Sequence, residues 1–337
     1  MNMKHKYLFF ALLLLAASCA RVVTENDNLI QKDVLDAWVG QNYPGVTASG
    51  TGIYILEDYP GYGAEYGGNS YIQVNYTKSD RSGLVSETTS KETARRVGIY
   101  KASTYYGPVI QNTDLSSLPV GIEDLLKGMR VGGRRKALIP GWLQTTDRYS
   151  DTSKYITVAT DLDDYIYDVT LEDSFDDVIQ YQIDKVEDLS RELYASADSL
   201  KWGFYYHRTG EPSSEEAIES TATMYMNYTG LLLDGTVFDT NIEKVAKDAG
   251  LYSSSKTYSP ATVTWGAEAD DITVTFAGSS SSTEPIDGFQ LTLWQMHPHE
   301  KGVGMFISTL GYGSSGSGKT IPAFAPLIFE IELVDKK

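Results

Sequence analysis

The stretch MNYTGLLLDGTVFDTN, residues 226–241, reads as a strand, a glycine-containing turn and a Phe-Asp pair. Further along stands the segment PIDGFQLTLWQM (285–296). The segment FISTLGYGSSGSGKTIPAFAPLIFEIELV (306–334) then predicts a loop and a final strand. Residues 327–333 alternate in the period of two that marks a half-buried strand.

In this order and at this spacing, the three segments resemble the family of FKBP-type peptidyl-prolyl cis-trans isomerases. Between Ile286 and Leu333 the similarity needs no gap. The resemblance implies an antiparallel sheet curled around a short helix, with an apolar pocket between them. It also implies isomerisation of Xaa-Pro bonds in proline-containing polypeptide clients, with no cofactor and no metal.

The resemblance further implies which residues form the site. The pocket would be lined by apolar side chains, with Phe289 at its floor: Tyr228, Phe238, Phe289, Ile321 and Phe329. Ile286 would offer its backbone amide to the substrate carbonyl. Tyr312 would donate its hydroxyl, and Asp239 would supply a carboxylate beside the bound imide.

These residue types suit the chemistry on physical grounds. An Xaa-Pro bond isomerises slowly because amide resonance imposes a barrier of roughly 18–20 kcal/mol. No proton or nucleophile has to be transferred. A dry aromatic pocket removes the water that stabilises the planar amide, and a few fixed donors then bind the twisted form more tightly.

The sequence departs from the family pattern at several places. The floor is Phe289 where the family usually has Trp, and Ser317 stands where a bulky or His residue is common. Between Asp239 and Ile286 lie 46 residues, which we interpret as an insertion able to cover or reshape the pocket. A further wall residue is expected near residues 272–274, but its position cannot be assigned.

Two segments of the chain share an order of elements, which predicts an internal duplication. Both pass through an Asn-Tyr-Thr strand, at Tyr76 and at Tyr228, and both end in alternating strands. We therefore predict an α+β protein with two FKBP-like domains, at 30–174 and 198–337, each preceded by a helix. Residues 175–197 are expected to be a helical linker, because their apolar stripe favours a core or spacer helix.

The first domain matches the family less completely. Tyr76 and GIEDLLKGMRVGGRRKALIP (121–140) are similar to the family's strand and helix. The Phe-Asp pair is replaced by residues near Ser86 and Glu87, the floor is Ile122, and no Tyr-Gly follows Pro140. We therefore expect an incomplete site and a structural or client-holding role.

The first residues predict export and lipidation. Lys4 and Lys6 precede an apolar run at 7–17, which is the layout of a secretory signal peptide over residues 1–18. The sequence LAASC (15–19) resembles a lipobox, which would make Cys19, the one cysteine in the chain, the lipid-modified first residue of a tether at 19–29. We expect a cell-envelope lipoprotein, attached to the outer membrane of a diderm bacterium on its periplasmic or surface face.

Charge and motifs exclude several other functions. A net charge of −17 disfavours nucleic acid as a partner, since phosphate binding needs clustered Lys and Arg. Residues 313–320 fit the P-loop expression, but Pro322 and Pro326 follow where a phosphate-binding helix is required, so nucleotide is not expected. The acidic run 161–164 lacks the central glycine of a calcium loop, and two histidines around Pro298 favour a loop over a zinc site.

Two other functional classes remain open at this point. The chain could be a polypeptide-binding lipoprotein in which an FKBP-like site has lost catalysis, and Asp239, Tyr312 and Phe289 would decide between the two. It could also be a glycan-capture lipoprotein. That reading predicts a row of exposed tryptophans, and the five present are scattered along the sequence.

Overall fold

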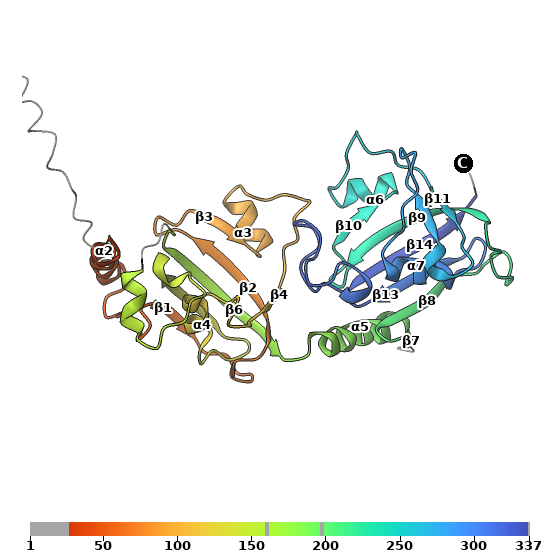
Figure 1. Ribbon diagram of the computed structural model, residues 1–337. Coiled ribbons are helices and arrows are strands. Elements are labelled where there is room, and N and C mark those ends of the chain that lie inside the picture. The colour runs from red at the N-terminus through yellow and green to blue at the C-terminus, as the bar shows by residue number, and fades with distance from the viewer. Residues whose placement is uncertain (1–26, 159–161, 196–198, 336–337) are drawn as a thin grey trace, which may run out of the picture.

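The computed structural model describes residues 27–158, 162–195 and 199–335; the expected signal peptide and Cys19 lie outside them. The described chain forms two units, each an antiparallel sheet curled around a short helix and preceded by a longer helix (Figure 1). The expected α+β class is therefore confirmed. Within the described ranges, none of the helices is both long enough and apolar enough to cross a membrane.

The N-terminal sheet has six strands, in the order β1-β5-β6-β2-β3, with β4 paired to β2. Their bounds are β1 Tyr54–Tyr59, β2 Tyr71–Ser79, β3 Val85–Thr88, β4 Val109–Asn112, β5 Arg134–Ile139 and β6 Tyr165–Phe175. On β2, Ile72 and Val74 are buried while their neighbours are partly exposed, as the period of two predicts. Leu125, on helix α4 (Val120–Leu126), is fully buried in the same core.

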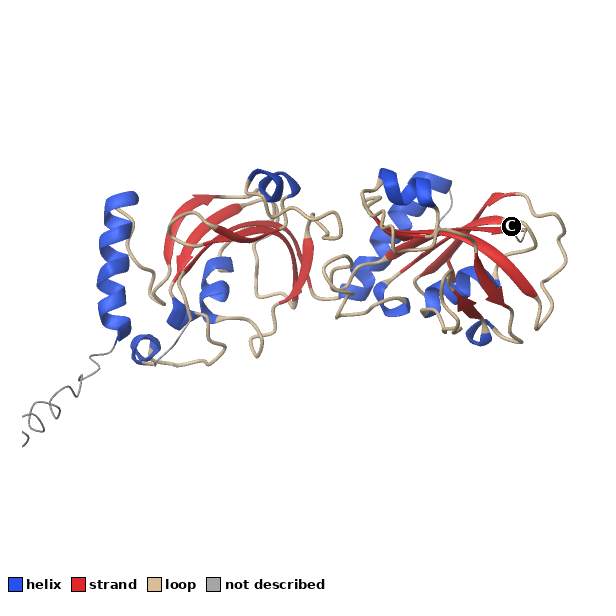
Figure 2. Ribbon diagram, turned by 90° about the horizontal axis from the view of Figure 1, so that it is seen from above, coloured by secondary structure: helices blue, strands red, loops and turns tan. Residues whose placement is uncertain are grey.

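The C-terminal sheet has eight strands, in the order β12-β11-β9-β14-β13-β8-β7, with β10 paired to β9. Their bounds are β7 Ser199–Lys201, β8 Phe204–Gly210, β9 Thr223–Leu232, β10 Val237–Thr240, β11 Ala261–Thr264, β12 Thr273–Thr275, β13 Lys301–Phe306 and β14 Leu327–Val334. The strands of each sheet arch over short helices (Figure 2). In the C-terminal unit that helix is α7 (Asp287–Trp294).

Helix α7 lies very close to the sheet because two glycines leave room for it. A Cβ on Gly288 would come within 2.4 Å of the Phe306 ring, and one on Gly304 within 1.8 Å of Thr292 Oγ1. Phe289 and Leu293 project from the helix into the core and are almost completely buried. The floor of the pocket is thereby fixed against the sheet.

Helix α5 (Val178–Tyr194) joins the two units and packs on the outer face of the C-terminal sheet. Asp177 caps it by accepting hydrogen bonds from the amides of Ile179 and Gln180 at 3.0 and 2.9 Å. Val186, on its apolar stripe, is completely buried in a cluster with Met305. The residues around 175 that were expected to start the linker helix instead end strand β6.

Helix α2 (Asp27–Asn42) begins earlier than expected, so residues 27–29 are helical rather than part of a tether. Asn28 is buried, and its side-chain amide donates to the carbonyls of Ile156 and Val158 at 3.0 and 2.6 Å. Asp164, from the acidic run, is also buried and accepts from Gln31 Nε2 at 2.7 Å. These polar contacts attach α2 to the N-terminal unit.

The duplication is visible in the hydrogen-bond register of the two sheets. The amide of Tyr76 donates to Thr89 Oγ1 at 2.9 Å, and that of Tyr228 donates to Asn241 Oδ1 at 2.8 Å. Tyr76 faces Val169 across its strand pair, as Tyr228 faces Ile331. The two tyrosines are 152 residues apart and occupy equivalent places.

The same separation of 152 residues relates equivalent elements in the segment that was expected to be an insertion. Helix α6 (Glu243–Asp248) has its counterpart in α3 (Lys91–Arg96). Tyr252 and Tyr258 stack at 5.5 Å, as do Tyr100 and Tyr106 at 5.4 Å. Residues 240–264 are thus common to both units, so this stretch of the expected insertion is not confined to the C-terminal unit. The part particular to the C-terminal unit is 265–285, which contains β12 and the short helix η3 (Ala269–Asp271).

Candidate functional site

One cavity of about 460 Å³ lies between the C-terminal sheet and helix α7. Strands β9, β10 and β14, helix α7 with its N-cap, and the loop before β14 all contribute residues to it. All eight residues expected at the site line this cavity: Tyr228, Phe238, Asp239, Ile286, Phe289, Tyr312, Ile321 and Phe329. Residues up to 101 positions apart in the sequence therefore meet at one place.

The floor and walls are aromatic rings in edge-to-face contact. The Phe289 ring lies 4.8 Å from Phe329 at 85° and 5.9 Å from Tyr228 at 83°. Phe238 meets Phe329 at 5.5 Å and 84°. A Cβ on Gly230 would come within 2.5 Å of the Phe238 ring, so this glycine allows the wall to lie against β9. Such contacts hold the rings in fixed positions.

The polar side of the cavity is centred on one carboxylate. Tyr228 donates its hydroxyl to Asp239 Oδ2 at 2.7 Å, and Lys256 forms an ion pair with the other oxygen. Burial, reinforced by the nearby Asp239 charge, raises the pKa of Tyr228 well above its ordinary value. Tyr228 therefore stays protonated at neutral pH and acts as a hydrogen-bond donor.

Two further donors at the cavity have no acceptor among the residues that the structure describes: the backbone amide of Ile286 and the hydroxyl of Tyr312. Ile286 is the N-cap of α7, where the amide points away from the helix ladder. Burial and the Asp239 charge raise the pKa of Tyr312, so its hydroxyl also keeps its proton. Both donors are available to an acceptor that enters the cavity.

The sequence did not identify the aromatic wall residue Phe276 or Lys256, the ion-pair partner of Asp239. Phe276 lies edge-on to Tyr228 at 5.7 Å and supplies the wall that could not be placed. The sequence does indicate a strand here, because Ile272, Val274 and Phe276 alternate with other residues. In the structure, Ile272 and Val274 are fully buried. Lys256 had no comparable signal, because only the folding of the segment after α6 brings it to Asp239.

The N-terminal unit has a smaller cavity at the equivalent place, of about 230 Å³. Tyr76 donates to Glu87 Oε2 at 3.2 Å, which repeats the pairing of Tyr228 with Asp239. Ile122 and Tyr167 also line it, Ile122 in the expected floor position. Fewer aromatic rings surround this cavity.

The two cavities differ at the N-cap of the pocket helix, where the N-terminal unit has a proline and the C-terminal unit has a backbone amide donor. Pro119 is the N-cap of α4, with φ −59° and ψ 142°, and Ile286 is the N-cap of α7, with φ −61° and ψ 150°. The two residues are conformationally equivalent, but proline carries no N–H. The N-terminal cavity therefore lacks the amide donor that the C-terminal cavity has.

The remaining motifs have structural explanations. Residues 313–320 form glycine turns closed by a bridge between Ser317 and Ile321, and strand β14 follows them. His297 lies 3.0 Å from the fully buried Glu300. Across the described residues, no group of three His, Cys, Asp or Glu side chains could hold a metal ion.

Residues 214–334, which carry this cavity, match the family described as FKBP-type peptidyl-prolyl cis-trans isomerase. This match falls within the C-terminal unit, which is therefore the clearer match of the two units to the family. No curated protein matches the chain.

Three solved structures are similar to this chain. One is a peptidyl-prolyl cis-trans isomerase from Pseudomonas syringae pv. tomato str. DC3000, at 20% identity and a TM-score of 0.32, covering 47% of this chain and 92% of that one. Another contains the three FKBP domains of wheat FKBP73, at 14% identity and 0.27, covering 86% and 98%. The third is the N-terminal domain of FKBP42 from Arabidopsis thaliana, at 14% identity and 0.29, covering 42% and 93%.

Proposed function

We propose that the C-terminal unit is a peptidyl-prolyl cis-trans isomerase that assists the folding of proline-containing polypeptides outside the cytoplasm. The observation that carries this proposal is the pair of unpaired donors, Ile286 N–H and Tyr312 O–H, at the edge of an aromatic cavity. Such a cavity can bind a prolyl ring and leave its amide carbonyl near fixed donors.

The reaction follows from differential binding of the twisted amide. A planar amide is polar and is stabilised by water, so its transfer into a cavity walled by Phe238, Phe289 and Phe329 favours the less polar twisted form. In the twisted form the carbonyl is free to turn toward Ile286 N–H, and the Tyr312 hydroxyl can hold the neighbouring part of the chain. These donors do not have to reorganise during the reaction.

The carboxylate of Asp239 has a different role from the two donors. Asp239 is held by Tyr228 and Lys256 and is oriented toward the cavity edge. Its negative charge lies beside the position of the bound imide and stabilises the carbonyl carbon as resonance is lost. No proton transfer is required, so Asp239 acts through its charge and not as a general base.

We propose that the N-terminal unit does not catalyse the reaction and instead has a structural or client-holding role. Pro119 supplies no amide proton, and no Tyr-Gly follows Pro140. A cavity without either donor can hold an apolar side chain but cannot stabilise the twisted amide.

We also propose that the chain is a lipoprotein of the cell envelope, anchored through Cys19. The test is fractionation of cells that express the chain with and without Cys19→Ser. The proposal expects wild-type chain in the membrane fraction and the variant in the soluble envelope fraction. Equal distribution of the two would reject the anchor and leave the isomerase proposal untouched.

The isomerase proposal is tested with a protease-coupled assay on an Xaa-Pro peptide, using the full chain and its Tyr312→Phe and Asp239→Ala variants. We expect acceleration by the wild type and a five- to ten-fold lower kcat/KM for Tyr312→Phe, since one neutral hydrogen bond contributes ~1–1.4 kcal/mol. If wild type and variants protect an unfolded client equally but none accelerates isomerisation, the chain is a binding module instead.

A further inference from the structure

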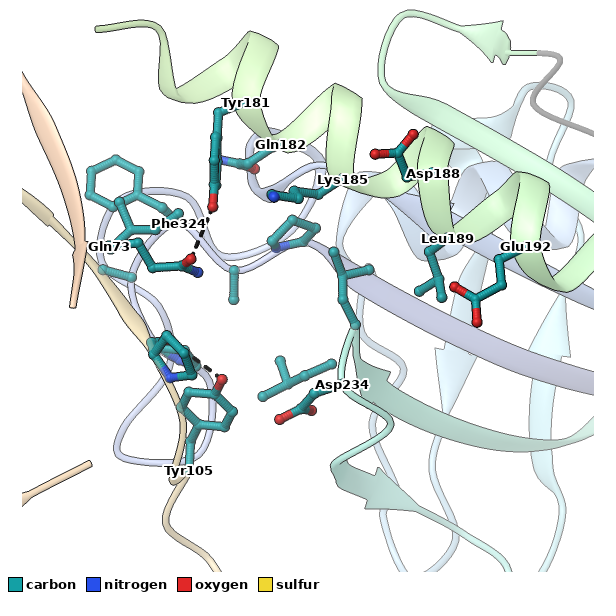
Figure 3. A pocket seen from close by; sticks show the side chains of 18 residues that line it. Gln73, Tyr105, Tyr181, Gln182, Lys185, Asp188, Leu189, Glu192, Asp234 and Phe324 are labelled. Atoms are coloured by element: carbon teal, nitrogen blue, oxygen red, sulfur yellow. Dashed lines mark hydrogen bonds between the residues drawn. The ribbon is translucent and has the colours of Figure 1, made fainter. Parts of the chain in front are cut away.

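A third cavity, of about 460 Å³, lies between the two units, apart from the candidate isomerase site and its N-terminal equivalent. Helix α5, the strand segments of both units and the loop before β14 surround it (Figure 3). Its walls are largely apolar. They come from the N-terminal unit, helix α5 and the C-terminal unit: Tyr105, Pro108, Tyr181, Leu189, Leu233 and Phe324.

Direct contacts between the units fix the shape of this cavity. Tyr181 on α5 donates its hydroxyl to Gln73 Oε1 at 2.9 Å. The backbone amide of Tyr105 donates to the carbonyl of Lys319 at 2.8 Å, and the rings of Tyr71 and Phe324 meet edge-on at 5.4 Å. The cavity is therefore a built feature and not merely a gap between two sheets.

Gln182 at this cavity carries an unsatisfied donor. Its Oε1 accepts from the amide of Ser308 at 2.7 Å, which fixes the orientation of the side-chain amide. Its Nε2 is buried and, among the described residues, is the one buried side-chain polar atom with no hydrogen-bond partner. A buried N–H without an acceptor is destabilising, so a carbonyl oxygen at this point would be bound favourably.

The edge of the cavity is negatively charged. Asp188 and Glu192 on α5 and Asp234 after β9 contribute three carboxylates, against one ammonium at Lys185 (Figure 3). Asp188 also lies 3.4 Å from Arg191, whereas Glu192 and Asp234 form no ion pair within the described part of the chain. Asp234 Oδ1 accepts from the amide of Thr236 at 2.9 Å, and a carboxylate that forms no ion pair suits a cationic group.

We propose that this cavity is a second polypeptide-binding site, which takes a short apolar segment of a client chain that carries a lysine or arginine. The apolar walls hold the segment, a backbone carbonyl accepts from Gln182 Nε2, and the basic side chain lies by Glu192 and Asp234. This binding does not depend on isomerisation in the C-terminal unit.

The loop before β14 connects the two sites. Ile321 lines the candidate isomerase cavity, and the next residue, Pro322, lines the cavity between the units. A client segment held between the units would therefore keep neighbouring prolines close to the other cavity.

The test is calorimetric titration of the full chain, at about 0.15 M salt to screen long-range attraction, with two capped, proline-free hexapeptides. One is Leu-Ile-Lys-Leu-Phe-Ala, and the other has Glu in place of Lys. We expect the Lys peptide to bind at least ten-fold more tightly. Combined Glu192→Gln and Asp234→Asn should remove most of that preference.

A matched control has the same change in charge at exposed carboxylates that line neither cavity: Glu268→Gln with Asp270→Asn. This control should bind the Lys peptide as the wild type does, and so should Ile286→Pro, which alters only the isomerase cavity. Absence of binding, an equal loss in the control pair, or a loss in Ile286→Pro would each overturn the proposal. Since the peptides lack proline, none of these outcomes depends on whether the chain is an isomerase.

Discussion

At the residue scale, the equivalent N-caps of the two pocket helices separate the two cavities. Ile286 and Pro119 share their backbone conformation, and only Ile286 has an amide proton. Tyr228 with Asp239 and Tyr76 with Glu87 show that the carboxylate pairing was kept in both units. The difference in function that we propose therefore rests on the loss of donors and not on a change of fold.

The comparison of the two N-caps gives a prediction for the backbone amide of Ile286. Ile286→Pro removes the donor but fits the existing φ of −61°, so the unit should keep its fold. We expect kcat/KM for an Xaa-Pro peptide to fall about ten-fold, which corresponds to ~1.4 kcal/mol. Ile286→Ala, which shortens the same side chain and keeps the N–H, is the control and should fall less. Equal losses in both variants would show that the side chain matters and the amide does not.

At the element scale, the close approach of α7 to β13 depends on glycine. Gly288→Ala would place a Cβ within 2.4 Å of the Phe306 ring, which is fully buried and cannot move away. We expect the free energy of unfolding to fall by about 1–3 kcal/mol, as for other overpacked cores. Thermal or urea unfolding measures this change.

Gly40→Ala is the matched control, because Gly40 is an exposed helical glycine with nothing within 4 Å of its added Cβ. That change should stabilise α2 by about 0.5–1 kcal/mol. If the two variants unfolded alike, the tight packing of α7 would not be a feature of the protein.

The contact of α5 with β8 predicts a pH dependence. His207 lies 2.7 Å from Ser190 Oγ and stacks on Tyr194 at 4.3 Å, and burial lowers its pKa below the ordinary value. The folded state thus favours the neutral ring. As the pH falls below about 6.5, the unfolded chain takes up a proton that the folded histidine resists, and stability is lost.

We therefore expect the free energy of unfolding to decline more steeply between pH 7 and pH 5 for the wild type than for His207→Gln. Urea unfolding across this range measures the two slopes, and the variant controls for the many carboxylates that also titrate. Parallel slopes would mean that His207 takes up its proton equally well in the folded state.

At the scale of the whole molecule, local order in the sequence allowed the fold class to be predicted, and the resemblance of three ordered segments to a known family allowed the pocket residues to be predicted. Alternation at 327–333 and the motif at 226–241 identify strands directly, and the eight site residues lie within the three segments 226–241, 285–296 and 306–334. Contacts that depend on how distant segments fold back were missed, as for Lys256 beside Asp239. The repeat through residues 240–264 was also missed, because its equivalence is clearer in hydrogen bonds and ring stacking than in residue identity.

The contact between the units could not have been predicted from either unit alone. Tyr105 and Lys319 are far apart in the sequence and join through backbone atoms, which leave no trace in side-chain pattern. The glycine-rich stretch at 313–320 therefore serves the packing of the two units as well as the wall of the pocket.

The duplication provides the most direct test of the central claim, that the C-terminal cavity alone is an isomerase. We would compare kcat/KM for an Xaa-Pro peptide in the wild type and in two matched double variants of the full chain. Tyr228→Phe with Asp239→Ala alters the C-terminal pair, and Tyr76→Phe with Glu87→Ala alters its N-terminal equivalent. We predict a loss of at least ten-fold in the first and a change of less than two-fold in the second. Loss in the N-terminal variant, or acceleration that survives in the C-terminal one, would contradict the account.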